Sequence, residues 1–294
     1  MKSIEFGKLH GLGNDFLVTR MGSNGGPARS LSQLAQDICH PHLGVGADGI
    51  MYYLPTVDDA QADFSTLIFN ADGSQAEMSG NGVRILAAFL RFQGEHTGET
   101  LRIRTVCGIR SLRLIAHVGN VCTFESSMGR PTTDPSKIPC LISPGPAPIV
   151  DWPLAVGSEA VRVTVSSMGN PHCSTFWPDV SCAPFEVLGP LLERHSSFPN
   201  RTNVEFVQVL DRHRLRVRFW ERGVGHTFAS GTGSCGASVA AILNNLAESP
   251  VMVETELGSL LVRWNPGEEL HLTGPAEFIC CGRYALKETT EARL

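Results

Sequence analysis

The 294-residue chain has no long apolar run, no cluster of basic residues and no regularly spaced cysteine pairs. No stretch approaches the roughly 20 consecutive apolar residues of a membrane-spanning helix, which excludes a helical membrane protein. The first residues, Met1 to Glu5, lack the apolar core of a secretory signal peptide. We therefore expect a cytoplasmic protein that does not bind membranes.

Charge and cysteine spacing exclude further classes. The formal net charge is −5, without a basic run or an arginine-rich helix face, so nucleic acid is not an expected partner. Nine cysteines occur without CxxC spacing, so we expect neither a disulfide framework nor a metal site. Most of these thiols should then be buried as small hydrophobic side chains.

Most of the chain has the short alternating pattern of β-strands. The clearest examples are Phe16–Thr19, Thr66–Phe69, Leu101–Arg104, Val161–Val165, Asn203–Val207 and Leu215–Phe219. Helical patterns are fewer. Leu31 to Ile38 has helical spacing after an N-cap at Ser30. Alanine-rich apolar segments predict two buried helices, Val83–Phe92 and Ala237–Leu246.

A stretch with seven prolines runs from Arg130 to Pro153 and has no clear period. It predicts a linker across a domain boundary, with strand patterns on both sides. The pattern as a whole indicates an α+β protein in two halves, each mostly sheet around one buried helix.

An internal repeat places the same short motif before each predicted buried helix. Ser79-Gly80-Asn81-Gly82 precedes the first helix, and Ser230-Gly231-Thr232-Gly233 precedes the second. Nine residues before each serine, a polar residue closes a strand: Asn70 in the first copy and Glu221 in the second. Two halves built on one plan suggest a duplication, with a site at the interface between them.

The repeated motif suits the binding of an anion. A glycine-rich turn that opens a helix points N–H groups outward, and the helix dipole adds partial positive charge. Two such turns facing each other would hold a carboxylate, with one serine on each side of it. One copy alone is equally well explained as an N-cap with a tight turn, but two matched copies favour function. A phosphate site is disfavoured, because neither GxGxxG spacing nor a P-loop lysine occurs.

Six motifs, in order along nearly the whole chain, resemble those of the diaminopimelate epimerase family. They are Phe6–Phe16, Leu43–Gly49, Phe69–Ser74, Met168–Cys173, Thr202–Phe206 and Glu221–Gly225. The resemblance implies an α+β fold of two pseudo-symmetric halves, each a mostly antiparallel sheet wrapped around a central helix. We expect residues 1–121 with 273–294 to form one half and 122–272 the other, with the active site in the cleft between them.

The resemblance also implies an isomerase that uses no cofactor, neither pyridoxal phosphate nor a metal. Family enzymes invert an α-carbon by a two-base mechanism, in which a thiolate removes a proton from one face while a thiol delivers one to the other. The expected reaction converts LL-diaminopimelate to the meso form, a precursor of lysine and peptidoglycan. The expected partner is thus a small-molecule amino acid. The oligomeric state is left open, with a homodimer as one candidate.

By the same resemblance, Ser79 and Ser230 stand where the family carries its two catalytic cysteines. His172 and Glu221 would tune these acid/base groups, although a structural histidine and a surface pair of Glu221 with Arg222 are the alternatives. The implied substrate-binding residues come from both halves: Asn14, Asn70, Gly80, Asn81, Asn170, Asn203, Glu221, Arg222, Gly231 and Thr232.

The two serines leave three interpretations open. A cysteine thiol has a pKa of about 8.5 that a helix N-terminus lowers, whereas a serine hydroxyl needs an adjacent base. The serines are either an engineered replacement that traps the site, natural groups activated by His172 and Glu221, or the mark of a non-catalytic amino-acid-binding homologue. His226 and the segment His40-Pro41-His42 also depart from the family pattern. A racemase of another amino acid, or an isomerase of other small acids, is therefore a further alternative.

Overall fold

The computed structural model describes residues 2–22, 30–56, 59–76, 80–142, 145, 147–157 and 159–286. Ser79, one of the two predicted catalytic positions, lies outside the described residues. Residue contacts divide the chain into unit 1, Met1–Ser126 with Pro275–Leu294, and unit 2, Ser127–Gly274. Within the described ranges, no helix is both long enough and apolar enough to cross a membrane.

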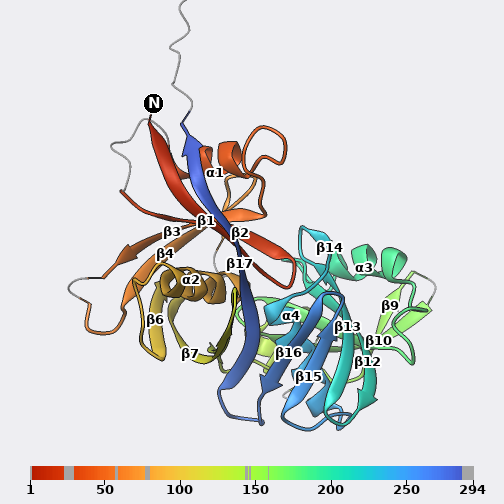
Figure 1. Cartoon of the computed structure of the whole chain (residues 1–294). Helices are drawn as coiled ribbons and strands as arrows, with labels where there is room; N and C mark the ends of the chain where they lie inside the picture. Colours follow the sequence, from red (N-terminus) through yellow and green to blue (C-terminus); the bar gives the residue numbers. More distant parts are fainter. Residues whose placement is uncertain are drawn as a thin grey trace, which may run out of the picture. The chain divides into compact units, whose positions relative to one another are not determined.

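Unit 1 is a mostly antiparallel sheet (Figure 1). Its strands are β1 (Ser3–Gly11), β2 (Asn14–Arg20), β3 (Gly49–Pro55), β4 (Phe64–Asn70), β5 (Gln75–Ala76), β6 (Thr100–Thr105), β7 (Gly108–Val118), β8 (Val121–Gly129) and the end of β17 (Leu270–Ala285). The pairs β2/β3 and β4/β6 are parallel, whereas β1/β2, β3/β4, β6/β7 and β7/β8 are antiparallel. Because β17 pairs with both β1 and β8, the sheet closes on itself.

Helix α2 (Gly80–Phe92) forms the core of unit 1, in contact with β1, β2 and β7. It is buried from Gly80 to Leu90, and this stretch buries the polar side chains of Asn81 and Arg84 along with its alanines and large apolar residues. Helix α1 (Leu31–Cys39) begins as predicted, since the Ser30 hydroxyl accepts a hydrogen bond from the Gln33 N–H at 3.2 Å. The sequence placed α1 to within one residue, whereas α2 begins three residues before the predicted start at Val83.

Unit 2 repeats the same order of strand pairings. Its strands are β9 (Trp152–Val156), β10 (Glu159–Ser167), β11 (Pro171–Phe176), β12 (Asn203–Asp211), β13 (Arg214–Glu221), β14 (Gly225–Thr227), β15 (Val251–Thr255), β16 (Gly258–Arg263) and the start of β17. The pairs β11/β12 and β13/β15 are parallel, and the pairs β10/β11, β12/β13, β15/β16 and β16/β17 are antiparallel. All six segments predicted as strands therefore lie in strands, in β2, β4, β6, β10, β12 and β13.

Helix α4 (Gly231–Leu243) lies against six strands of unit 2, β10 to β13, β15 and β16. It begins and ends earlier than the predicted segment Ala237–Leu246. Its first turns consist of small residues with weak helix propensity, and close packing favours them. A Cβ atom at Gly233 would stand 2.7 Å from the Phe219 ring. A third helix, α3 (Phe185–Glu193), packs on β9, β12 and β13.

The proline-rich segment is not a linker, contrary to the prediction. Ile138, Ile142 and Ile149 are buried in a hydrophobic core of unit 2, and a short 3-10 helix, Pro135–Lys137, precedes them. The division between the units lies before this segment, at Ser126. Prolines prevent regular pairing of the backbone, but the isoleucines between them still anchor the segment to the core.

The expectation that most cysteines are buried is wrong. Cys39, Cys122, Cys173 and Cys235 are buried, Cys140 is half-buried, and Cys107, Cys182, Cys280 and Cys281 are exposed; none of the nine forms a disulfide. Cys107 and Cys182 lie in a turn and a bend. Cys280 and Cys281 are neighbours near the end of β17, and both are exposed, so both faces of the strand are open to solvent there. Local sequence does not reveal such exposure, because cysteine is compatible with both environments.

Candidate active site

The second copy of the repeated motif forms the start of α4 in unit 2. Ser230 is the N-cap, with extended backbone angles (φ −133°, ψ 126°), and its Oγ accepts a hydrogen bond from the Gly233 N–H at 3.1 Å. The serine is buried, as is Gly231, and Thr232 is half-buried. The N–H groups of a first helical turn have no intrahelical acceptor, and the dipole makes this end positive. The start of α4 therefore has N–H groups and a partial positive charge that could hold an anion.

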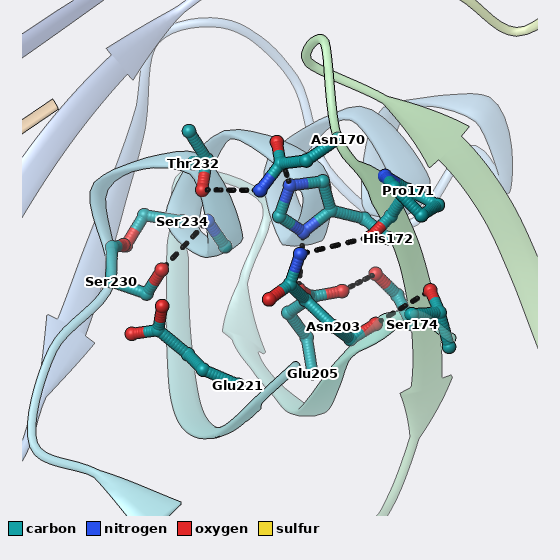
Figure 2. Close-up of polar contacts among 12 residues, drawn as sticks. Asn170, Pro171, His172, Ser174, Asn203, Glu205, Glu221, Ser230, Thr232 and Ser234 are labelled. Atoms are coloured by element: carbon teal, nitrogen blue, oxygen red, sulfur yellow. Dashed lines mark hydrogen bonds and ion pairs between the residues drawn. The ribbon is translucent and has the colours of Figure 1, made fainter. Parts of the chain in front are cut away.

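Glu221, at the end of β13, is half-buried and points its carboxylate toward the Ser230 hydroxyl (Figure 2). The Thr227 hydroxyl donates a hydrogen bond to Glu221 Oε1 at 2.7 Å. Burial raises the pKa of the Glu221 carboxyl, while hydrogen bonds from Thr227 and Ser230 and the nearby His172 oppose the rise. A raised pKa makes this carboxylate a stronger base, and it stands beside the serine that needs one.

His172 is fully buried between β12 and α4. Its Nδ1 lies 2.6 Å from Oε1 of Glu205, which is also fully buried, and the Ser174 hydroxyl donates to Oε2 of the same carboxylate at 2.9 Å. The parallel pairing of β11 with β12 sets His172 beside Asn203, two residues before Glu205. Glu205 belongs to the motif Thr202–Phe206, but the sequence does not indicate that Glu205 is the partner of His172.

The remaining candidate residues of unit 2 are linked to one another by side-chain contacts. Nε2 of His172 lies 3.1 Å from Oδ1 of Asn170, whose Nδ2 lies 3.5 Å from the Thr232 hydroxyl. The Asn203 amide donates to the Pro171 carbonyl at 3.0 Å and accepts from the Arg222 N–H at 3.0 Å. Asn203 thus fixes the backbone on both sides of the site, while the Arg222 side chain is exposed.

In unit 1, the start of α2 carries the first copy of the motif. Gly80 and Asn81 are buried, and the Asn81 amide donates to Oδ1 of Asn14 at 3.4 Å. The buried Arg84 donates to Oδ1 of Asn81. The Asn14 amide in turn donates to Asp48 at 2.8 Å. Asn14 and Asn81 are therefore in contact, and Asp48 is a further partner of Asn14 that the sequence did not indicate.

Asn70, the other predicted residue of unit 1, is exposed and bonds within its own turn. Its side chain donates to the Ser74 hydroxyl at 2.9 Å, and its backbone N–H donates to the Ser74 carbonyl at 2.9 Å. Gly73, at φ +83°, allows this turn. Among the described residues, the Asn70 side chain bonds here rather than to Asn14 or Asn81.

Two cysteines near the predicted site in sequence, Cys173 and Cys235, are both fully buried. Cys173 points into the hydrophobic core of unit 2, and burial raises its pKa well above the ordinary value. Cys235 is fully buried within α4. In the ranges that the structure describes, no group of three His, Cys, Asp or Glu side chains could hold a metal ion. The groups near the start of α4 that could carry a proton are the Ser230 hydroxyl, the Glu221 and Glu205 carboxylates and the His172 imidazole.

Sequence comparison matches residues 6–133 and 164–279 to the family diaminopimelate epimerase. The diaminopimelate epimerase of Pelotomaculum thermopropionicum is 41% identical over 281 residues, covering 96% of this chain and 99% of the relative. That of Moorella thermoacetica is 42% identical over 284 residues, covering 96% and 100%.

Solved structures show the same fold at low sequence identity. A hydroxyproline epimerase from Agrobacterium vitis aligns with a TM-score of 0.69 at 14% identity, over 98% of this chain and 94% of its own. A phenazine biosynthesis protein of the PhzF family from Bacillus anthracis aligns with a TM-score of 0.68 at 14% identity, over 97% and 100%. By the sequence matches over nearly its full length, the chain belongs to the diaminopimelate epimerase family.

Proposed function

We propose that the chain is an epimerase that interconverts LL- and meso-diaminopimelate by proton transfer on two faces of one α-carbon, without a cofactor. The proposal rests on family membership and on relatives of about 41% identity named for this activity. The observation that carries it is the start of α4, where the Ser230 hydroxyl stands beside the Glu221 carboxylate with its raised pKa. A serine with an adjacent base is a usable proton carrier.

The proposal includes two pseudo-symmetric halves with the substrate in a cleft between them. Two observations support it: the strand pairings follow the same order in the two units, and each unit has a buried helix whose first turn is the Gly-x-Gly of a Ser-Gly-x-Gly motif. The first turns of α2 and α4 would hold the α-carboxylate by their N–H groups. Asn14, Asn81, Asn170 and Thr232 would then lie around the substrate, whose distal amino-acid group would reach Asn70, Asn203 and Arg222.

In the proposed step at Ser230, the Cα–H bond breaks and the proton moves to the serine Oγ. The hydroxyl proton moves at the same time to Glu221, and the electron pair of the broken bond spreads into the α-carboxylate. The N–H groups of the two helix starts stabilise that charge. A proton reaches the opposite face through the Ser79 hydroxyl, which takes a replacement from solvent, while Glu221 releases its proton to solvent.

The test is exchange of the substrate α-proton in heavy water, followed by mass spectrometry and by separation of the LL and meso isomers. The proposal expects exchange and isomer conversion by the present chain. Exchange only in the Ser79→Cys/Ser230→Cys variant would show a trapped site, and would overturn the serine–carboxylate step. Saturable binding without exchange in either form would indicate a binding homologue. Exchange of proline or hydroxyproline in place of diaminopimelate would reassign the substrate.

A further inference from the structure

A continuous line of side-chain contacts runs from the core of unit 2 to the first turn of α4 (Figure 2). It begins with the Ser174 hydroxyl, which donates to Oε2 of Glu205. Oε1 of Glu205 meets Nδ1 of His172, and Nε2 of His172 meets Oδ1 of Asn170. The Asn170 amide then reaches the Thr232 hydroxyl. The buried carboxylate is thus joined to the helix start through one imidazole and one amide.

The geometry of this line sets where the protons lie. Oδ1 of Asn170 can only accept a hydrogen bond, so Nε2 of His172 carries a proton directed at it. A second proton lies between Nδ1 and Glu205 Oε1, which are 2.6 Å apart. With two protons the Glu205–His172 pair has no net charge. A pair with one proton would be a buried anion close to Glu221, which is costly in a region that excludes water.

The position of the ring is held from the other side by α4. A Cβ atom at Gly236 would stand 2.9 Å from the Cβ and Cγ atoms of His172 and 3.2 Å from its Nδ1. The imidazole is therefore confined between the backbone of α4 and the Glu205 carboxylate of β12. Its protonated Nε2 edge has one fixed direction, and that direction is toward Asn170.

We infer that Glu205 is a positioning residue, which acts through His172 to hold the Asn170 carbonyl toward the imidazole and the Asn170 amide N–H toward the start of α4. The inference deepens the proposed function and rests on it for the identity of the anion. With the amide in this orientation, the helix start presents an additional donor to the substrate carboxylate. With the amide reversed, a carbonyl oxygen would face that carboxylate and repel it.

The proton at Nε2 is measurable without any substrate. In protein labelled with 15N-histidine, the His172 signals are assigned by their loss in His172→Gln. The inference expects a protonated Nε2 at neutral pH in the unliganded chain. An Nε2 without a proton would reverse the amide of Asn170 and would overturn the inference, whatever the chain catalyses.

The functional part is tested by calorimetric binding of diaminopimelate to variants of Glu205 and Asn170. Glu205→Met removes the acceptor of Nδ1 and should weaken binding about 10-fold or more, which corresponds to roughly 1.4 kcal/mol. Glu205→Gln should rescue most of the affinity, because its amide can donate to Nδ1 and keep the proton on Nε2. Glu254→Met, a change on β15 where the carboxylate pairs with Arg214 and Arg216, is the matched control.

A double-mutant cycle separates positioning from a general structural effect. If Glu205 acts through Asn170, Glu205→Met should have little further effect in an Asn170→Ala background. An equal loss of affinity with and without Asn170 would overturn the inference. If the unchanged protein binds no diaminopimelate, the proposed function fails, while the state of Nε2 still decides the role of Glu205. The same nitrogen measurement decides the matter if Glu205→Met does not fold.

Discussion

The His172 ring packs directly on the backbone of α4 at Gly236, where a Cβ atom would stand 2.9 Å from the Cβ and Cγ atoms of the histidine. The contact explains a glycine in the middle of a buried helix, where its conformational freedom is otherwise unfavourable. Glycine is required here because an imidazole occupies the space of its side chain.

Gly236→Ala should therefore displace the histidine from Glu205 and Asn170. We expect a loss of stability of about 1–3 kcal/mol from overpacking, and a fall in α-proton exchange of at least 10-fold. The matched control is Ser238→Ala in the same helix, which removes one hydrogen bond to the Ser234 carbonyl and leaves the histidine in place. Chemical denaturation and the exchange assay measure both effects. Unchanged exchange in Gly236→Ala would contradict the role assigned to the ring.

Two N-cap serines allow structural and functional effects to be separated. Ser230 caps α4 and Ser30 caps α1, each accepting a bond from the N–H three residues on. Loss of either cap should lower the free energy of unfolding by about 1 kcal/mol. Only Ser230→Ala should also abolish exchange, because Ser30 lies outside the proposed site. Equal exchange in the two alanine variants would remove Ser230 from the mechanism.

The raised pKa of Glu221 links activity to pH. The carboxylate accepts a proton only when ionised, so exchange should rise with pH through a midpoint above 4.5, the ordinary value for Glu. Glu221→Gln should abolish the rise. Thr227→Val removes a hydrogen bond that lowers the pKa, so this change should move the midpoint higher. A midpoint unaffected by Thr227→Val would show that another group titrates.

The same shift has a consequence for stability, with a defined sign. Because the folded state binds the Glu221 proton more tightly than the unfolded state, its stabilising contribution is complete below about pH 4.5 and is lost as pH rises through the folded pKa. Relative to Glu221→Gln, the unchanged protein should therefore lose stability over that pH range. If the free energies of unfolding of the two proteins, measured by chemical denaturation, changed equally with pH over this range, the raised pKa of Glu221 would be refuted.

Thiol reactivity should follow burial rather than sequence spacing. Four exposed cysteines, Cys107, Cys182, Cys280 and Cys281, should react rapidly with an alkylating reagent at pH 8. The buried thiols should react only after unfolding; burial raises the pKa of Cys39 to about 12, which leaves almost no thiolate. Peptide mass spectrometry before and after denaturation measures this. Rapid labelling of Cys39 in the folded protein would contradict its placement.

The sequence predicts those parts of the fold that depend on local patterns. Alternating residues located the strands, and Ser30 located the start of α1. The beginning of α4 was not located, because Gly231 to Gly236 have the composition of a turn. Their helical form is favoured by tertiary contacts, with Phe219 and His172 occupying the space that larger side chains would need.

The partners of the site residues could not be predicted for a related reason. Glu205 lies between Val204 and Phe206, and all three are buried, so alternation does not distinguish an inner from an outer face. Its contact with His172 spans 33 positions, and that of Asn14 with Asp48 spans 34. Both contacts depend on a parallel strand pairing, whose register is set by the whole fold rather than by either segment.

The pairing of β1 with β17 has a consequence for the order in which the protein is made. Ser3 pairs with Ala285, so the strand that closes unit 1 is translated after all of unit 2. Until residues 275–285 have been made, the edge of β1 that pairs with β17 in the finished fold has no partner strand, and unpaired strand edges promote aggregation. Unit 1 therefore cannot close its sheet until unit 2 has been made. Until residue 285 has left the ribosome, the free edge of β1 is exposed to pairing with strands of other chains.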